Sequence, residues 1–514
     1  MRTQLQTDTP LLEFWDATRL RASDEQSADA VGTPGVDAAF RAAVAITLGH
    51  GCGQRPGTVL DKGGAFVQAR TTPSAGALYP FEVLVSLSDG VRYATYLYDV
   101  EAGRISRLSS VMPIPATELA TEAGLACGAG EPPQALVTLV ARPWKAMAKY
   151  GDRGYLYTYL DIGHAATNIA MSALAAGLKP TVHLRFRRQW LAHAFGLTGS
   201  CREPQLVVAL APGEPADRTG LPDDVVIPVW RDRRQARLEP PSHQEEQNWN
   251  TLRDISVSFV PAMLPRHGRA ASIVEPRLPV RPADPLPGPP ERVEVRLPRS
   301  VGARAVPDAY PRLALGRQSA KGFLVESVSF DAFAGLFDGV SGELDCDFAD
   351  ARGAGVGVQV VVRDVDGLAS GGYGYSPGRQ ALFPLEPGRN DAVSDDEVLA
   401  ICQGQSGLRH AAALIHLHAP LRPLLRKHGR AGLAEVHFHA AHVAQRLCLN
   451  AVRHRVGITC VGGFDDRRCA AVAHLADEDE VIYLLAVGAS DPNARKTDRD
   501  GIAYSHGMTS ARIG

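Results

Sequence analysis

Three short segments of the chain carry residue types that suit a flat, phosphate-bearing ligand. The first, Thr72-Pro73-Ser74-Ala75-Gly76-Ala77-Leu78-Tyr79-Pro80, is dense in small residues and precedes a predicted strand. Small side chains at Pro73, Ser74, Ala75 and Gly76 let the backbone approach a planar ligand, and the serine adds a hydroxyl donor. A plain turn with no ligand is the alternative interpretation of this segment.

The second segment places Arg317, Ser319 and Lys321 at alternate positions. Alternate side chains of an extended backbone point the same way, so all three can face one phosphate group. The alternative is the solvated end of a connector. The third segment ends on Gly462 and Gly463, where bare backbone N–H groups can reach a ring nitrogen of the ligand.

The elements that position these segments occur twice in the sequence. Residues 149–186 align with residues 427–464 at a constant offset of 278 and without a gap. The matched pairs include Lys149 with Lys427, Gly151 with Gly429, His164 with His442, Ala173 with Ala451 and Thr181 with Thr459. In both copies the apolar spacing predicts a buried helix followed by a strand. The offset is too long for a solenoid repeat, so we expect two homologous domains packed as a pseudo-dimer.

Each predicted domain mixes strands with apolar helices. Residues 82–87 and 91–98 predict paired strands across the turn at residues 88–90, and residues 356–362 predict a corresponding strand in the second half. The pattern Ser-x-x-Glu at Ser394 predicts the start of a helix, and the same pattern at Ser242 predicts another near residue 243. The predicted fold class is α+β, occurring twice.

The predicted boundaries are a first domain over residues 1–240, a connector over residues 241–311 and a second domain over residues 312–514. Residues 261–311 hold 12 of the 36 prolines. Proline fixes φ and removes a backbone donor, so we expect neither a helix nor a sheet to run through this stretch.

The composition excludes several classes of function. There are 54 Lys and Arg residues against 56 Asp and Glu residues, and this near-neutral balance argues against a nucleic-acid partner. No stretch approaches the roughly 20 apolar residues of a membrane span, and the first residues have no signal-peptide core, so we predict a cytoplasmic protein without a membrane partner. The eight cysteines have no metal-binding spacing, so we predict free buried thiols and no metal site.

Together these segments resemble the nitroreductase-like flavin family, and within it the azoline dehydrogenases, which are the SagB-type oxidases of thiazole- and oxazole-modified peptides. The resemblance covers most of the chain outside the connector. It is carried by residues 14–20, Pro-Ser-Ala-Gly-Ala-Leu-Tyr-Pro (73–80), Lys-Tyr-Gly-Asp-Arg (149–153), Tyr-Leu-Asp-Ile-Gly-His (159–164), Ala-Gly-Leu (176–178), Arg317-x-Ser319-x-Lys321, Cys-Gln-Gly-Gln (402–405), Lys-His-Gly-Arg (427–430) and Gly462-Gly463.

The resemblance implies that the chain binds FMN between its two halves. The implied phosphate ligands are Arg317, Ser319 and Lys321, with help from Lys496 and Arg499. The implied contacts of the flavin ring are Pro73, Ser74, Ala75, Gly76, Gln405, Gly462 and Gly463.

In this family an Arg-x-Ser-x-Arg/Lys segment of one subunit and a Pro-Ser segment of the other meet on each flavin. Here residues 38–48 lack the first motif, and residues 351–355 stand where the second half would carry the other. We therefore expect one composite site, with its symmetry mate lost.

The resemblance also implies the chemistry. Azoline dehydrogenases remove the Cα proton of a thiazoline or oxazoline while a hydride leaves to FMN, and oxygen then yields hydrogen peroxide. A base is needed over the ring, and the family's Lys-Tyr pair corresponds to Lys149 and Tyr150, which we predict to be catalytic. The implied substrate is a ribosomally made azoline-containing precursor peptide, such as a thiopeptide, delivered by a cyclodehydratase or peptide-recognition partner. The chain would be a monomeric pseudo-dimer or a higher homo-oligomer.

Two other functions fit the same sequence. One is an NAD(P)H-dependent nitro or quinone reductase, which needs no base over the flavin. The other is a flavin-free scaffold that docks a peptide, in which both sites have degenerated. Among single residues, Lys149 and Tyr150 could be a surface pair. Lys496 and Arg499 could belong to a polar tail, and His164 and His442 are interpreted as core or interface histidines.

Overall fold

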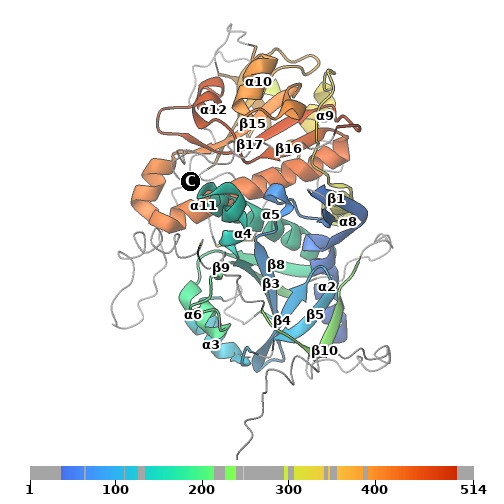
Figure 1. Ribbon diagram of the computed structural model, residues 1–514, viewed down its shortest axis with the longest axis vertical. Coiled ribbons are helices and arrows are strands. Elements are labelled where there is room, and N and C mark those ends of the chain that lie inside the picture. Colours follow the sequence, from blue (N-terminus) through green and yellow to red (C-terminus); the bar gives the residue numbers. More distant parts are fainter. Residues whose placement is uncertain are drawn as a thin grey trace, which may run out of the picture.

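The two halves of the chain fold as two similar α+β units. The computed structural model describes residues 36–62, 65–108, 110–125, 133–213, 226–238, 247, 294–298, 306–340, 345–347, 356–385 and 392–494. Figure 1 shows the second half above the first, with the long helix α11 (Leu421–His454) running between the two sheets. The predicted fold class and its duplication are confirmed.

Each half is built on one sheet, and the two sheets have matching strand orders. The first sheet runs β10 (Val229–Ala236), β5 (Arg104–Leu108), β4 (Arg92–Asp99), β3 (Phe81–Ser88), β7 (Ala135–Ala141), β9 (Glu203–Pro212) and β8 (Leu178–His183), and β6 (Ile114–Pro115) pairs with β4. The second runs β11 (Val295–Arg296), β14 (Ala381–Pro384), β13 (Gly371–Ser376), β12 (Gly357–Val362), β15 (Ala413–Ala419), β17 (Glu480–Gly488) and β16 (Gly457–Val461). All neighbours are antiparallel except β10 and β5. A hairpin of β1 (Gln54–Lys62) and β2 (Ala65–Arg70) stands apart.

Helices cover both faces of each sheet. The inner layer holds α5 (Arg153–Ala175) and α11, joined by α2 (Ala38–Cys52) and α8 (Val306–Gly316), while α4 (Pro143–Tyr150) precedes α5. The outer faces pack against α3 (Ala116–Glu122) and α6 (Arg188–Ala194) in the first half, and against α10 (Asp395–Ile401) and α12 (Asp466–Val472) in the second. Another short helix, α9 (Phe330–Gly335), packs into the core of the second half. Because both faces are covered, the central strands β7 and β15 are buried at every position.

The contact between α5 and α11 has approximate two-fold symmetry. His164 Nδ1 lies 2.8 Å from Gln445 Oε1, and Thr167 Oγ1 lies 3.1 Å from His442 Nδ1. The offset of 278 converts the first pair into the second. A Cβ on Gly163 would lie 2.6 Å from that of its own counterpart, Ala441, so the glycine lets the two helices approach closely. Both histidines are buried interface residues, as predicted.

Several local predictions are confirmed. Strands β3 and β4 pair across the predicted turn, where Gly90 has a φ of 94°. The Ser394 hydroxyl accepts a hydrogen bond from the Glu397 amide and begins α10. At equivalent positions of the duplication, Gly151 and Gly429 have φ values of 58° and 54°, and each lies between two helical segments.

The connector prediction is partly wrong. Strand β11 lies within residues 241–311 and pairs with β14, and α8 begins at Val306. Pro311 even lies inside α8. Proline at the start of a helix loses no intrahelical hydrogen bond, and one internal proline removes only one, so neither excludes a short helix that packs well. The helix predicted near residue 243 falls outside the described residues except for Gln247, as does the segment 14–20.

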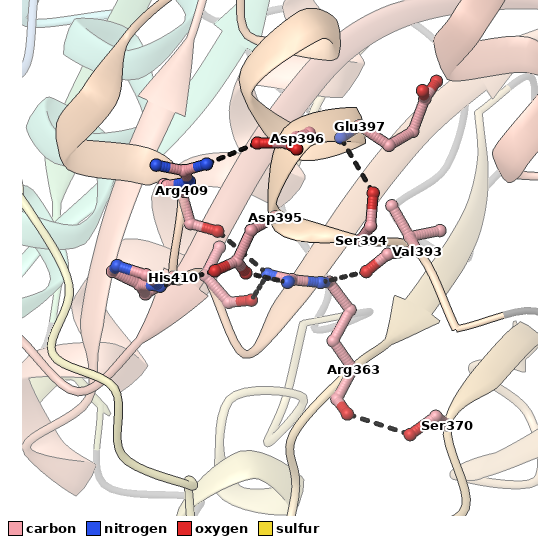
Figure 2. A network of polar contacts seen from close by, with 10 residues as sticks. Arg363, Ser370, Val393, Ser394, Asp395, Asp396, Glu397, Arg409 and His410 are labelled. Atoms are coloured by element: carbon pink, nitrogen blue, oxygen red, sulfur yellow. Dashed lines mark hydrogen bonds and ion pairs between the residues drawn. The ribbon is translucent and has the colours of Figure 1, made fainter.

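One half-buried arginine fixes the outer layer of the second half. Figure 2 shows Arg363, at the end of β12, bonded to three backbone carbonyls and to Asp395. The carbonyls belong to Val393, Arg409 and Ala411, at 2.7, 3.1 and 2.5 Å. Asp395 begins α10, and the other partners flank the loop over residues 402–408. Arg363 therefore holds the loop that carries Gln405.

Candidate functional site

The segment after α8 crosses from the second half to the first. The Arg317 side chain is 7% exposed, and its Nε donates to the Thr71 carbonyl at 2.9 Å. Its Nη2 lies 3.5 Å from the Arg70 carbonyl. Thr71 directly precedes the Thr72–Pro80 segment, so the structure joins two predicted site segments from different halves at one place.

A cation cluster forms beside this contact, consisting of Arg55, Arg317 and Lys321. Burial, followed by the charges of Arg317 and Arg55, lowers the pKa of Lys321. Burial, followed by the charge of Arg317, lowers the pKa of Arg55 to about 10. Among the described residues no carboxylate forms an ion pair with any of the three. Three half-buried or buried cations with mutual repulsion fit a phosphate group, which would supply the missing counter-charge.

The other predicted phosphate and ring contacts lie near this cluster or outside the described residues. Ser319 is half-buried between Arg317 and Lys321. The Gln405 side chain donates to the Cys402 carbonyl at 3.0 Å, and its role at a ring remains a prediction. The Gln405 loop reaches the cluster, since the Gly407 carbonyl accepts from the Phe323 amide at 3.0 Å.

Lys496 and Arg499 lie outside the described residues. The last described residues lie near the cluster. The Asp491 amide donates to the carbonyl of Gly322, the residue after Lys321, at 2.9 Å.

The Pro73–Gly76 turn is hydrogen-bonded to the buried carboxylate of Asp161 on α5. Ser74 Oγ donates to Asp161 Oδ2 at 2.5 Å, and the Ala75 amide donates to Asp161 Oδ1 at 3.1 Å. Ser74 Oγ also accepts from the Tyr79 amide at 2.8 Å, which closes the turn. Burial raises the pKa of Asp161 to about 7, against the lowering effects of its Ser74 and Ala75 hydrogen bonds and of His164.

Tyr150 meets the same turn from the other side. Its hydroxyl occupies the place where a side chain at position 76 would stand, so only glycine fits there. Gly76 also has a φ of 57°, which favours glycine. The Tyr150 ring packs edge-on against Tyr157 with centroids 5.0 Å apart. Lys149 is half-buried, and its Nζ lies 5.8 Å from the centroid of the Tyr150 ring.

Gly462 and Gly463 complete this region from the second half. A Cβ on Gly462 would lie 3.0 Å from the Tyr157 ring, so this glycine faces the tyrosines of the first half. Within the described part of the chain, no residue accepts a hydrogen bond from either glycine amide. The structure therefore gathers Tyr150, the Ser74 turn and the two glycines around one region between the halves.

The symmetry-related position is filled by the protein itself. The duplication places Leu184 and Arg185 where the other copy has Gly462 and Gly463. Both amides donate to the carboxylate of Asp347, at 2.8 and 3.0 Å. The Arg185 side chain forms two hydrogen bonds with buried Glu435, at 2.7 and 3.1 Å. An acidic side chain thus takes the amide donors that stay unpaired at the first position.

Asp161 gives the site a testable pH dependence. The ordinary pKa is 3.8, and burial raises it to about 7, so between these values the folded chain keeps a proton that the unfolded chain has lost. Stability from this group is complete below about pH 4 and is lost as the pH rises toward about 7. Asp161→Asn should remove that loss. In urea unfolding, the free energy of unfolding of the variant should rise by about 3 kcal/mol relative to that of the wild type as the pH goes from about 5 to about 8.

The exposed Asp366 provides the control for this measurement. Asp366→Asn should follow the wild-type pH dependence. A wild-type dependence that persists in Asp161→Asn would show that Asp161 is ionised in the folded protein throughout this range.

Sequence reasoning missed Arg55, Asp161 and Asp347. For Asp161 a signal existed, because a carboxylate inside an apolar helix is rarely buried without a partner. Arg55 and Asp347 have no local signal, because each acts on a segment far away in the chain.

The paired sheets and the helices between them define a tandem nitroreductase-like fold. The Nitroreductase family matches residues 385–489. A protein described as the nitroreductase MJ1384 of Methanocaldococcus jannaschii is 34% identical over 112 residues, which are 21% of this chain and 54% of that relative. The chain thus spans about half the length of the curated relative it matches.

Solved structures agree on the fold. A crystal structure described as a nitroreductase from Anabaena variabilis covers 90% of this chain and 90% of its own, with a TM-score of 0.66 and 20% identity. A chain of the E. coli microcin synthetase McbBCD complex, with truncated pro-MccB17 bound, matches 41% of this chain and 84% of its own, with a TM-score of 0.28 and 19% identity. The first likeness establishes the fold, and the second is too partial to carry an argument.

Among the described residues, no helix is long and apolar enough to cross a membrane. In that same part of the chain, no three His, Cys, Asp or Glu side chains are grouped in a way that could hold a metal ion.

Proposed function

We propose that this protein is an FMN-dependent dehydrogenase that oxidises thiazolines or oxazolines of a ribosomally made peptide to thiazoles or oxazoles. The nitroreductase-like fold supports a flavin-dependent oxidoreductase. The observation that carries the finer proposal is the position of Tyr150, preceded by Lys149, against the Gly76 turn. An oxidase of this kind needs a base at the ring, whereas a reductase supplied by a nicotinamide does not.

The residues around the interface fit FMN. Arg55, Arg317, Ser319 and Lys321 would hold its phosphate, because the cation cluster has no counter-charge among the described residues. The Pro73–Gly76 turn would line one side of the ring system, and the unpaired amides of Gly462 and Gly463 would lie near its nitrogen atoms. When bound, FMN supplies a two-electron acceptor that oxygen restores, with hydrogen peroxide as the product.

The chain's own residues handle the proton. The azoline ring loses one proton and one hydride as it becomes an azole. The proton would pass to the neutral amine of Lys149, directly or through the Tyr150 hydroxyl, because that hydroxyl lies at the turn and the lysine nitrogen lies over the tyrosine ring. The Tyr157 ring packs against Tyr150 and gives the pair an apolar neighbour. Exclusion of water at such a site strengthens each electrostatic contact with the substrate.

The proposal is tested with purified protein reconstituted with FMN. Because Asp347 and Arg185 fill the symmetry-related position, we expect about one FMN per chain after denaturation and quantification. A synthetic peptide with one thiazoline should then lose two hydrogen atoms in air and release hydrogen peroxide. Rapid oxidation of NADH or NADPH without peptide turnover would identify a reductase. Failure to retain FMN would favour the docking scaffold, and two FMN per chain would refute the single site.

A further inference from the structure

Two cysteines lie in contact beside the candidate site. The Sγ atoms of Cys448, near the end of α11, and Cys460, on β16, are 3.7 Å apart. Cys448 is buried, whereas Cys460 is half-buried and stands two residues before Gly462. The seven described cysteines are free thiols, of which five are buried as predicted, whereas Cys346 and Cys460 are half-buried, and Cys127 falls outside the described residues.

A chain of hydrogen bonds fixes the protonation of His164 beside this pair. The Thr71 carbonyl can only accept, so the Asn168 amide nitrogen faces it, at 3.5 Å. The Asn168 oxygen then accepts from Gln445 Nε2 at 2.7 Å, which turns Gln445 Oε1 toward His164 Nδ1 at 2.8 Å. In the neutral imidazole, His164 Nδ1 therefore carries the hydrogen, and Nε2 carries a lone pair that can accept from the Tyr483 hydroxyl.

His164 and Tyr483 lie beside the thiol of Cys460. The His164 Nε2 atom lies 3.2 Å from the Tyr483 hydroxyl, and both groups act on the charge of the Cys460 sulfur. A thiol, a base and an amide that orients the base form the arrangement used to activate a nucleophilic sulfur. The hydrogen bond from Cys448, with help from His164 and Tyr483, lowers the pKa of Cys460 well below its ordinary value. The same contact raises the pKa of Cys448, so that thiol keeps its proton.

We propose that Cys460 and Cys448 form a peroxide-reactive dithiol, a second chemical activity of this chain. The Cys460 sulfur attacks one oxygen of hydrogen peroxide and breaks the O–O bond. Cys460 becomes a sulfenic acid, and the second oxygen leaves as water after taking the thiol proton that His164 held. Cys448 then attacks the oxidised sulfur, a disulfide forms, and a second water leaves. Two thiols are oxidised and one peroxide is reduced.

The position of the pair suits a small uncharged oxidant. Cys460 is only half-buried, and its charge acts on Asp161, which holds the Ser74 turn. A dithiol here would meet peroxide formed at the proposed flavin site, and this one step depends on the proposed function. The reaction itself does not, because reagent hydrogen peroxide can be supplied to the FMN-free chain.

The first experiment treats the reduced, FMN-free protein with hydrogen peroxide and alkylates the remaining thiols. Peptide mapping should find a Cys448–Cys460 disulfide, with a loss of two hydrogen atoms and two alkylation sites per chain. Cys346→Ser is the matched control, because Cys346 is also a half-buried thiol and does not belong to the proposed pair. Its oxidation should equal that of wild type. If both cysteines remain reduced, or oxidise no faster than Cys346, the proposal is wrong.

Two variants separate the steps. Cys448→Ser should stop at a sulfenic acid on Cys460 that a dimedone probe labels, whereas Cys460→Ser should leave Cys448 unlabelled. His164→Gln keeps a hydrogen-bonding side chain but no base, and should slow Cys460 oxidation by about tenfold or more near neutral pH.

The groups facing the pair are His164 and Asp161 on α5, Tyr483 on β17, and Arg317, whose charge acts on Cys448. Oxidation of His164→Gln should speed up again as the pH rises toward the pKa of an ordinary thiol, because the thiolate then forms without a base. An unlabelled Cys448→Ser variant with wild-type folding would overturn the assignment of Cys460 as the reacting sulfur.

Discussion

Azoline oxidation is expected to fall by about 10²–10⁴-fold in both Tyr150→Phe and Lys149→Ala, while each variant retains the wild-type FMN content. The phenylalanine keeps the ring that packs 5.0 Å from Tyr157, so only the hydroxyl at the Gly76 turn is lost. The alanine removes an ammonium that lies beside the same ring. Neither residue belongs to the cation cluster, so the expected loss is in kcat. Peptide turnover by mass spectrometry, with FMN quantified in the same sample, measures it.

The duplication supplies the matched control. Lys427 stands at the position equivalent to Lys149, but its neighbour is His428, and the site around that copy is closed by Asp347 and Arg185. Lys427 is exposed. Lys427→Ala should therefore oxidise the thiazoline peptide at the wild-type rate. If Lys149→Ala and Lys427→Ala behaved alike, Lys149 would have no role in proton transfer, and the reductase alternative would gain support.

The fold could be predicted from the sequence because its signals are local and repeated. The apolar period of residues 153–175 returns in residues 431–453, and the offset of 278 holds through Gly151 and Gly429 without a gap. A helix followed by a strand, found twice at that distance, requires two equivalent units. The connector was less predictable. Proline density describes average chain conformation, and β11 and α8 form because the second half provides partners for them.

The site was only partly predictable, for a physical reason. Alternation of Arg317, Ser319 and Lys321 shows that three groups can face one ligand, but not what stands opposite them. Arg55 joins the cluster through tertiary contact, with its Nε bonded to the Leu315 carbonyl at 2.8 Å. The missing motifs predict that the symmetry mate is lost. The structure adds Asp347, whose carboxylate accepts hydrogen bonds from two amides at that position, and no sequence pattern connects Asp347 to them.

Lys321→Met is expected to weaken FMN binding by about tenfold to 100-fold without destabilising the FMN-free protein. The reason is that the side chains next to Lys321 also carry positive charges. Burial, followed by the charges of Arg317 and Arg55, lowers the pKa of Lys321, so the ammonium is desolvated and also repelled when no anion is bound. Methionine keeps the apolar stem and removes the charge, so the empty site loses a repulsion and the filled site loses a phosphate contact.

Two measurements on each variant test this argument. Fluorescence titration gives the Kd for FMN, and thermal unfolding without FMN gives the Tm of the empty protein. Lys179→Met, at an exposed lysine on β8, is the control and should change neither value. A lower Tm for empty Lys321→Met with an unchanged Kd would mean that Lys321 stabilises the fold and not a phosphate. If the Tm of the FMN-free variant is raised or unchanged while FMN binds more weakly, the cations of the cluster repel one another until an anionic ligand binds. The reason is that removing the cation relieves repulsion in the FMN-free protein, whereas in the complex it removes an attraction to the bound negative charge.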